Sequence, residues 1–522
     1  MSTNTSSPGA APQEAHLSRV LGPLHLWALA VGLVISGNYF GWSYGMESGG
    51  PMGLLYALIP VTLFYVTFML SYSELATMIP HAGGPSAYAR RAMGPFGGYM
   101  NGVCCLIEFV FAPPAIALAV GGYIENLSGG ALGQIPVAIG AYFLFIFINY
   151  LGMKTSARFE LVVTLIALAG LLIFWAAAAP NFSWERIGTL QNGSEGIMGA
   201  VTFAIWFYLA MEGGAMAAEE MIHPQKDIPM GFLTGCGTLM VMGVLTLLCT
   251  AGIADYTGLM KLDFPLPAAL EGAFGQGATI GKVVNVIGLF GLIASLHGII
   301  VGYSRQTYAM ARTGYLPKFL ARVSPKTHAP FWALLVPGLV GIVPIALGLI
   351  DKSYAAGLTA TMITISVFGS VAMYIISLLS LFILRQKEPN LKRPFKVMYP
   401  IVPAVSMILA LFCLYCVVFY NTAATCGRTT LTISRAASAA GRRTTSSSRA
   451  DALPAASTNS ALATPSFSSR KPAWPCASAV TSRTTTSGSA CRSATTVACA
   501  STAPQCRPGA SPCTVAASTS SW

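Results

Sequence analysis

The sequence predicts an all-α protein that crosses a membrane many times. Of its 522 residues, 54% are hydrophobic and only 9% are charged, whereas about 25% of the residues in an ordinary soluble domain are charged. The mean hydropathy of +0.63 is too high for a single soluble core of this length. Apolar stretches of about 20 residues, the length at which a helix spans a bilayer, recur along the first 420 positions.

Eleven of these stretches are expected to be membrane-spanning helices. They centre near residues 35, 66, 108, 142, 168, 208, 240, 295, 340, 370 and 410. Residues 1–22 before them are polar, and the first apolar stretch is too long for the core of a cleavable signal peptide. We therefore divide the chain into a cytoplasmic N-terminal segment (residues 1–22), a transmembrane domain (residues 23–420) and a tail (residues 421–522).

The basic residues between the expected spans predict the orientation. If the N-terminus is cytoplasmic, sixteen Lys and Arg residues fall on the cytoplasmic side and four on the opposite side. An excess of Lys and Arg in cytoplasmic loops is the general rule for helical membrane proteins. Because the bias alternates correctly across all eleven spans, we expect a multi-pass protein of a bacterial inner membrane with a cytoplasmic N-terminus.

The tail differs in composition from the rest of the chain. Residues 421–522 hold ten Lys or Arg, one acidic residue and six of the twelve cysteines, with long runs of Ser, Thr and Ala. Such a segment lacks the apolar residues that offset ordering entropy, so we expect it to be disordered. A shifted reading frame in a GC-rich gene would produce this mixture and would have removed a twelfth helix. A native stalk-like or regulatory extension is the alternative.

The first expected span is interrupted by polar and small residues. Ser36, Gly37, Asn38 and Gly41 lie between apolar flanks, and glycine costs about 1 kcal/mol relative to alanine inside a helix. In lipid, unwound backbone is tolerated only where it lines a cavity or is buried in protein. Taken alone, these glycines are explained equally well by the close approach of a neighbouring helix.

The sixth expected span is interrupted at the corresponding place, five helices later. Glu212 is followed directly by Gly213 and Gly214 inside an apolar run, and Glu108 is a similar carboxylate in the third span. A carboxylate within a membrane is costly and marks a functional site by default, and paired broken helices indicate a transporter binding site. Aromatic residues, whose faces can attract an ammonium group, cluster near both breaks: Tyr39, Phe40, Trp42, Trp206, Phe207 and Tyr208.

Three motifs resemble those of the amino acid–polyamine–organocation (APC) transporter superfamily. They are the glycine-interrupted first span, residues 73–76 followed by residues 80–88, and residues 219–220 followed by residues 224–229. The similarity covers roughly residues 18–420. Within the superfamily, the chain resembles the ethanolamine permease branch in residues 34–42, 80–85 and 107–116.

The resemblance implies a LeuT-like fold of five plus five inverted-repeat helices, with broken helices 1 and 6 and two extra helices. It implies a permease rather than an enzyme: a symporter that imports ethanolamine or a close amine together with protons. Glu212 would link protonation to gating. The substrate would be bound by residues of the two breaks: Ser36, Gly37, Asn38, Tyr39, Gly41, Trp206, Phe207, Ala210 and Gly213.

The chemistry of ethanolamine gives an independent check on these residues. Ethanolamine carries an ammonium group and a hydroxyl group but no carboxylate. Glu108 and Glu212 could supply negative charge for the ammonium group, and Ser36 or Asn38 a polar contact for the hydroxyl. Burial favours the neutral form of a glutamate, whereas a nearby cation favours the charged form. One such residue could therefore exchange a proton for the substrate.

Other functions stay open at this point. One is a permease for an amino acid or a polyamine on the same fold, another is a nutrient sensor that binds without transport, and a third is a transport-inactive frameshifted product. No nucleotide-binding P-loop pattern is present, which disfavours ATP-driven transport. The tail cysteines do not match a zinc pattern, and we expect no metal and no cofactor. Most of the formal charge of +12 lies in the tail, so this charge does not indicate a nucleic-acid partner.

Two further ionisable residues lie in expected spans outside the breaks. Glu74 is near the cytoplasmic end of the second span, and we expect a structural role with Arg90 or Arg91 as its partner. His297, within the eighth span, is either a buried polar group or an element of a proton relay.

Overall fold

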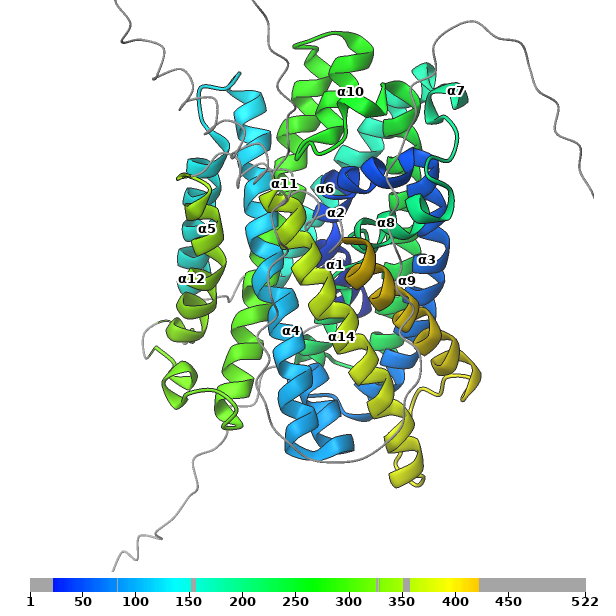
Figure 1. The fold of residues 1–522 in the computed structure, drawn as a ribbon. Helices are drawn as coiled ribbons and strands as arrows, with labels where there is room; N and C mark the ends of the chain where they lie inside the picture. The colour runs from blue at the N-terminus through cyan, green and yellow to red at the C-terminus, as the bar shows by residue number, and fades with distance from the viewer. Residues whose placement is uncertain are drawn as a thin grey trace, which may run out of the picture. The chain divides into compact units, whose positions relative to one another are not determined.

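The computed structural model shows a bundle of α-helices (Figure 1). It describes residues 22–81, 83–151, 156–324, 327, 329–350 and 357–421. The all-α class predicted from the sequence is confirmed. The predicted N-terminal segment before residue 22 and the predicted disordered tail after residue 421 lie outside the described residues.

Seven helices among the described residues are long and apolar enough to cross a membrane. These are α3 (Met46–Met78), α4 (Gly84–Leu127), α6 (Ser156–Ala178), α9 (Pro224–Ile253), α11 (Thr279–Arg312), α14 (Leu358–Lys387) and a C-terminal helix, Ile401–Asn421. Shorter apolar helices fill the other expected places: α1 (Pro23–Val34), α5 (Gln134–Tyr150), α8 (Gly193–Ile205) and α12 (Phe331–Leu347). Helices therefore lie at or beside each of the eleven expected positions.

Short elements complete the connections between these helices. The first span continues beyond α1 through α2 (Ser36–Tyr39) and the 3-10 helix η1 (Trp42–Gly45), and the sixth continues beyond α8 through η3 (Met211–Glu220). One end of the bundle carries α7 (Trp184–Ile187), η4 (Tyr256–Gly258) and α10 (Pro265–Phe274) (Figure 1). The remaining short elements are η2 (Ala179–Asn181) and η5 (Lys318–Ala321).

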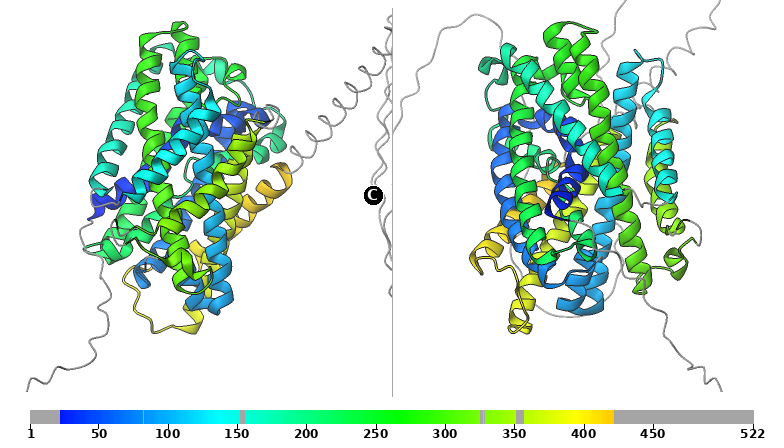
Figure 2. Two further views of the ribbon diagram at one scale, coloured as in Figure 1. Left: turned by 90° about the vertical axis from the view of Figure 1, so that its left-hand side faces the viewer. Right: turned by 180° about the vertical axis from the view of Figure 1, so that it is seen from behind.

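The first helix lies in the interior, whereas two other helices stand at an edge. α1 packs against α6, α9 and α11, and α14 runs along α4. Figure 1 and the view from behind in Figure 2 show α5 and α12 together at one margin of the bundle. There Phe143, Phe147 and Val343 are each about half exposed. Exposed apolar side chains on this scale are what a lipid-facing surface requires.

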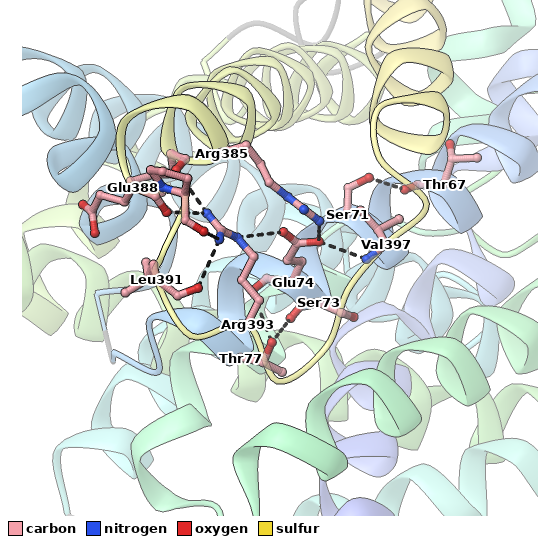
Figure 3. A network of polar contacts seen from close by, with 12 residues as sticks. Thr67, Ser71, Ser73, Glu74, Thr77, Arg385, Glu388, Leu391, Arg393 and Val397 are labelled. Carbon is pink, nitrogen blue, oxygen red and sulfur yellow. Dashed lines mark hydrogen bonds and ion pairs between the residues drawn. The ribbon is translucent and has the colours of Figure 1, made fainter.

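Glu74 joins three distant segments at the end of the bundle where α14 ends (Figure 3). Its Oε2 accepts hydrogen bonds from Arg385 Nη2 at 2.6 Å and from the backbone N–H of Val397 at 2.9 Å. Arg393 Nε lies 3.5 Å from its Oε1. The expected partners, Arg90 or Arg91, were therefore wrong: Arg91 pairs with Glu388 instead. The true partners lie about three hundred residues away in sequence, beyond the reach of local pattern.

Candidate functional site

The first helix breaks where the sequence places its glycines. Phe40 has an extended backbone (φ −158°, ψ 173°) between α2 and η1. The next residue, Gly41, has a φ of 90°, a conformation that glycine adopts without the penalty a Cβ would bring. The helix therefore stops after Tyr39 and restarts as a single 3-10 turn.

The sixth helix breaks at the corresponding place. α8 ends at Ile205, residues 206–210 form turns, and η3 begins at Met211. Ala210 has a φ of 73°, a left-handed conformation that costs an L-residue with a Cβ roughly 1–2 kcal/mol. Strain of this kind persists only where the surroundings enforce it and is concentrated at functional sites.

The two breaks face one another directly. A Cβ on Gly37 would overlap the carbonyl oxygen of Trp206, and a Cβ on Gly41 would overlap its indole ring. Phe40 meets the Trp206 ring edge-on at 5.5 Å between centroids, and Trp42 stacks on Phe207 at 5.9 Å. The glycines thus serve close approach of the two broken helices, and these four aromatic residues of the predicted cluster pack between them. Tyr208, another member of that cluster, stacks instead on Tyr65 of α3.

A small cavity lies between the breaks. Its volume is about 10 Å³, which is room for roughly one water molecule. Its lining residues are Leu33, Val34, Ser36, Ile116, Trp206, Leu209 and Ile299. Two predicted binding residues, Ser36 and Trp206, are thus in the lining, which is otherwise aliphatic and carries no charge.

Several buried polar atoms beside this cavity have no hydrogen-bond partner among the described residues. These are both amide atoms of Asn38 and the indole Nε1 of Trp206, although Asn38 is fully buried and Trp206 nearly so. Ser36 is held by its backbone N–H, which donates to Ser295 Oγ at 3.1 Å. Because buried polar groups are almost always paired, the free donors and acceptor suit a small polar ligand.

Glu108 and Glu212 form a buried pair. Both are fully buried, and their carboxyl groups adjoin one another. Tyr374 donates its hydroxyl proton to Glu212 Oε2 at 2.8 Å, while both Glu108 oxygens and Glu212 Oε1 lack a side-chain donor among the described residues. Two carboxyl groups can hydrogen-bond to each other only if one is protonated. The pair is therefore suited to hold a proton or to bind a cation.

The carboxyl pair is separate from the lining of the cavity. On α4, Glu108 precedes the lining residue Ile116 by eight positions, about 12 Å of helix. Two predicted site residues lie between the cavity and the carboxyl pair. Ala210 directly follows the lining residue Leu209. Gly213 packs between the lining residue Leu33 and Phe109, which follows Glu108.

Tyr39 and Phe207 are buried in packing positions near the breaks. The Tyr39 hydroxyl donates to the carbonyl oxygen of Ala167 at 2.6 Å, and Phe207 packs against Gly243 as well as Trp42. The binding and gating roles expected for the full set of site residues stay predictions.

The sequence reading missed two buried carboxylates, Glu160 and Asp263. Glu160 on α6 is 3% exposed, and its Oε1 and the Thr164 hydroxyl have no partner among the described residues, although both lie against Gly32 of α1. It was overlooked because the nearby Lys154 and Arg158 make it resemble a helix end in water. Asp263 lies in the loop before α10, where no apolar run draws attention to it. Its buried state depends on contacts with other elements.

His297 is held by a neighbouring polar side chain. Its Nδ1 lies 3.2 Å from Asn149 Nδ2 on α5, so the ring has a polar partner within the bundle. No group of three or more His, Cys, Asp or Glu side chains in the part of the chain that the structure describes could hold a metal ion.

Comparison with known proteins agrees with this architecture. The family model described as amino acid permease matches residues 21–433. An uncharacterized transporter of Rhizobium meliloti is 30% identical over 78% of this chain and 88% of its own length. A branched-chain amino acid permease and a methylthioribose transporter of Bacillus subtilis are 25% and 27% identical, each over 78% of this chain and 89% of its own length.

These matches cover the whole helical bundle, including both broken helices and the cavity between them. A multi-pass bundle with two facing helix breaks is the architecture in which membrane transporters bind their substrates at mid-membrane. The chain belongs to the amino acid permease family of the APC superfamily of transporters.

Proposed function

We propose that the protein imports ethanolamine by proton-coupled secondary transport. The observation that carries this proposal is the set of unpartnered polar atoms at the facing breaks: the Asn38 amide and the Trp206 indole N–H, next to Ser36 in the cavity lining. The Asn38 amide oxygen can accept from an ammonium group. The Trp206 N–H and the Asn38 amide N–H₂ can donate to a hydroxyl oxygen.

The charge of the cavity lining also favours a small cation. The cavity has room for roughly one water molecule in this arrangement, so a ligand enters only when the facing helix breaks separate. The Trp206 ring face can attract an ammonium group, a contact worth up to about 2 kcal/mol when desolvated. The cavity lining contains no Lys or Arg side chain that would repel the cation.

Proton coupling is assigned in this proposal to the Glu108–Glu212 pair. A proton on the pair and a cation near it compete electrostatically, because both neutralise the same negative charge. Entry of ethanolamine and release of a proton would therefore be linked through one buried group.

A second candidate substrate is an amino acid with a branched apolar side chain. The aliphatic lining residues Leu33, Val34, Ile116, Leu209 and Ile299 favour it, as does the similarity to a branched-chain amino acid permease. Its carboxylate would bind backbone N–H groups at the helix breaks.

Radiolabelled uptake into proteoliposomes tests both candidates. We expect [¹⁴C]ethanolamine uptake that an inward proton gradient stimulates and that excess leucine leaves unchanged. Asn38→Leu should weaken the apparent affinity at least about tenfold, the loss expected when one charge-assisted hydrogen bond is removed. Thr234→Val, a similar change at an exposed position of α9, is the matched control. No uptake of [¹⁴C]ethanolamine, together with uptake of labelled leucine that excess ethanolamine does not inhibit, would instead support the amino acid as substrate.

A further inference from the structure

Asp263, in the loop before α10, accepts hydrogen bonds from three separate elements. Tyr44 of η1 donates its hydroxyl proton to Oδ1 at 2.8 Å. Gln134 Nε2 at the start of α5 and the Thr359 hydroxyl of α14, at 3.2 Å, both donate to Oδ2. Behind it, the Asp263 side chain lies against Gly122 of α4, where a Cβ would come within 3.1 Å. One carboxylate thus joins the loop to four helical elements.

The same loop holds the outer part of the broken first helix at two more points. Ser43 donates its hydroxyl proton to the Leu262 carbonyl at 2.9 Å, and Lys261 pairs with Glu47 at 2.8 Å. Tyr44 also stacks on Phe203 of α8, with 6.0 Å between centroids. Since η1 follows directly after Gly41, these contacts tie the loop to the segment that leaves the first helix break.

No cation contacts Asp263 among the described residues. The groups that face it are a phenol from η1, an amide from α5 and a hydroxyl from α14. From α4, the Tyr123 phenol is close enough to interact electrostatically. Lys261, two residues before Asp263, pairs with Glu47. A proton on Asp263 would therefore meet no opposing positive charge. It would turn one accepting oxygen into a donor, which Gln134 Nε2 cannot accept and which the Tyr44 or Thr359 hydroxyl could accept only by reversing its own hydrogen bond.

We propose that Asp263 is a reversible latch: its ionised form holds η1 and the loop before α10 together, and its protonation releases them. In the closed state the Tyr44, Gln134 and Thr359 donors are all satisfied by one carboxylate. After protonation one hydroxyl must reverse its hydrogen bond or one donor must lose its acceptor, which weakens the attachment and lets the α10 side of the cavity open. The latch concerns conformation only; its use in proton-driven uptake rests on the proposed function.

Asp263 changes its protonation state between pH 7.5 and pH 5.0. Burial raises its pKa to about 6, against the opposing effect of the hydrogen bonds from Tyr44, Gln134 and Thr359. With a pKa of 6, the protonated fraction rises about thirtyfold between pH 7.5 and pH 5.0. A compartment at pH 5 to 6 would thus release the latch, and one at pH 7.5 would keep it closed.

Hydrogen–deuterium exchange of the full chain in nanodiscs, without substrate, tests the latch directly. After correction for the intrinsic effect of pH, backbone exchange in residues 259–264 should accelerate up to about thirtyfold from pH 7.5 to pH 5.0, following the protonated fraction. In Asp263→Asn exchange should be fast at both pH values. Asp255→Asn, the same change at an exposed carboxylate eight residues earlier, should still show the acceleration of exchange between pH 7.5 and pH 5.0.

A second variant covers the case in which Asp263→Asn does not fold. Tyr44→Phe removes one donor from the carboxylate and should shift the midpoint upward by about one pH unit, because a hydrogen bond to the charged form is lost. The latch would be overturned if exchange in Asp263→Asn still accelerated between pH 7.5 and pH 5.0. It would also be overturned if the pH at half-maximal acceleration in Tyr44→Phe were unchanged or lower. Because the assay contains no substrate, a step that is present while ethanolamine uptake is absent would refute the proposed substrate and leave the latch standing.

Discussion

The two ends of the bundle each bury one carboxylate that joins distant segments, but the two are held differently. Glu74, near the end of α3, faces two arginines and a backbone N–H. Asp263 meets Tyr44, just before the start of α3, together with other neutral donors. From the kink at Gly50 to Glu74, α3 runs for about 36 Å, so the two carboxylates lie near opposite ends of this helix.

This difference indicates which buried carboxylates can take up and release a proton. Two arginines supply counter-charges to Glu74, and breaking a buried ion pair is strongly destabilising. Neutral donors stabilise a carboxylate less, so Asp263 can be protonated at moderate cost. Among the residues that the structure describes, the Glu108–Glu212 pair in the middle of the bundle contacts no cation and accepts from one side-chain donor, Tyr374. Fixed attachment and reversible protonation are thus separated by the partners of the carboxyl group rather than by its burial.

The largest effect is expected from removing the charge at Glu74. Glu74→Gln removes the buried carboxylate that faces both Arg385 and the Arg393 side chain, which is 5% exposed. We expect a loss of about 3–5 kcal/mol in the free energy of unfolding, the usual result of breaking a buried pair. Chemical unfolding in mild detergent measures it, with Glu388→Gln as the surface control. A loss as small as that of the control would contradict the view of Glu74 as a fixed attachment.

The next largest effect concerns transport rather than stability. Under the proposed function, Glu212→Gln should abolish proton-driven accumulation of ethanolamine and leave the protein inserted, because the carboxyl that exchanges a proton is gone. Accumulation and counterflow in proteoliposomes distinguish loss of coupling from loss of binding. Glu160→Gln, the same change in another buried carboxyl, is the comparison. If the pH dependence survives in Glu212→Gln and disappears in Glu160→Gln, the coupling role belongs to Glu160.

Glu108 should have a smaller and more selective effect. Glu108→Gln should weaken binding of ethanolamine about tenfold or more, the cost of losing a nearby unscreened charge, and should change binding of a neutral analogue such as ethylene glycol much less. Equilibrium binding of both ligands to the purified protein gives the two ratios. Equal losses for both ligands would show that Glu108 supports the fold of the site and not recognition of the cation.

The helices and the two breaks could be predicted because their signals are local. Each signal is contained within about 20 consecutive positions: the apolar runs, the glycine pair beside Glu212 and the glycines around Asn38. The same local signals brought Ser36 and Trp206 into the expected site, and both line the cavity.

The partners of the buried carboxylates could not be predicted, because they are set by tertiary contacts. Glu74 and Arg385 are 311 residues apart, and Tyr44 and Asp263 are 219 apart. Asp263 also lies in a polar loop, where a carboxylate is common and its burial is not indicated by the sequence. Sequence proximity suggested Arg91 for Glu74, but Arg91 contacts Glu388 instead.

The Arg91–Glu388 pair provides the smallest expected effect and the sharpest control for Glu74. Its side chains are 41% and 33% exposed, although the geometry is good: Arg91 Nη2 lies 2.7 Å and Nε 3.0 Å from the carboxylate oxygens. Hydrogen bonding to Arg91 lowers the pKa of Glu388 below its usual value. The stabilisation is therefore present above the unfolded pKa of about 4.3 and is lost as the pH falls through the lower folded value.

For this exposed pair, screening limits the contribution to less than about 1 kcal/mol. Glu388→Gln should therefore lower the melting temperature slightly at pH 7, and 0.5 M NaCl should remove most of that difference, because exposed charges are screened at this ionic strength. The loss in Glu74→Gln should be unaffected by the same salt. If both losses respond equally to salt, water reaches the Glu74 cluster, and the contrast between a fixed and a reversible carboxylate would fail at that end.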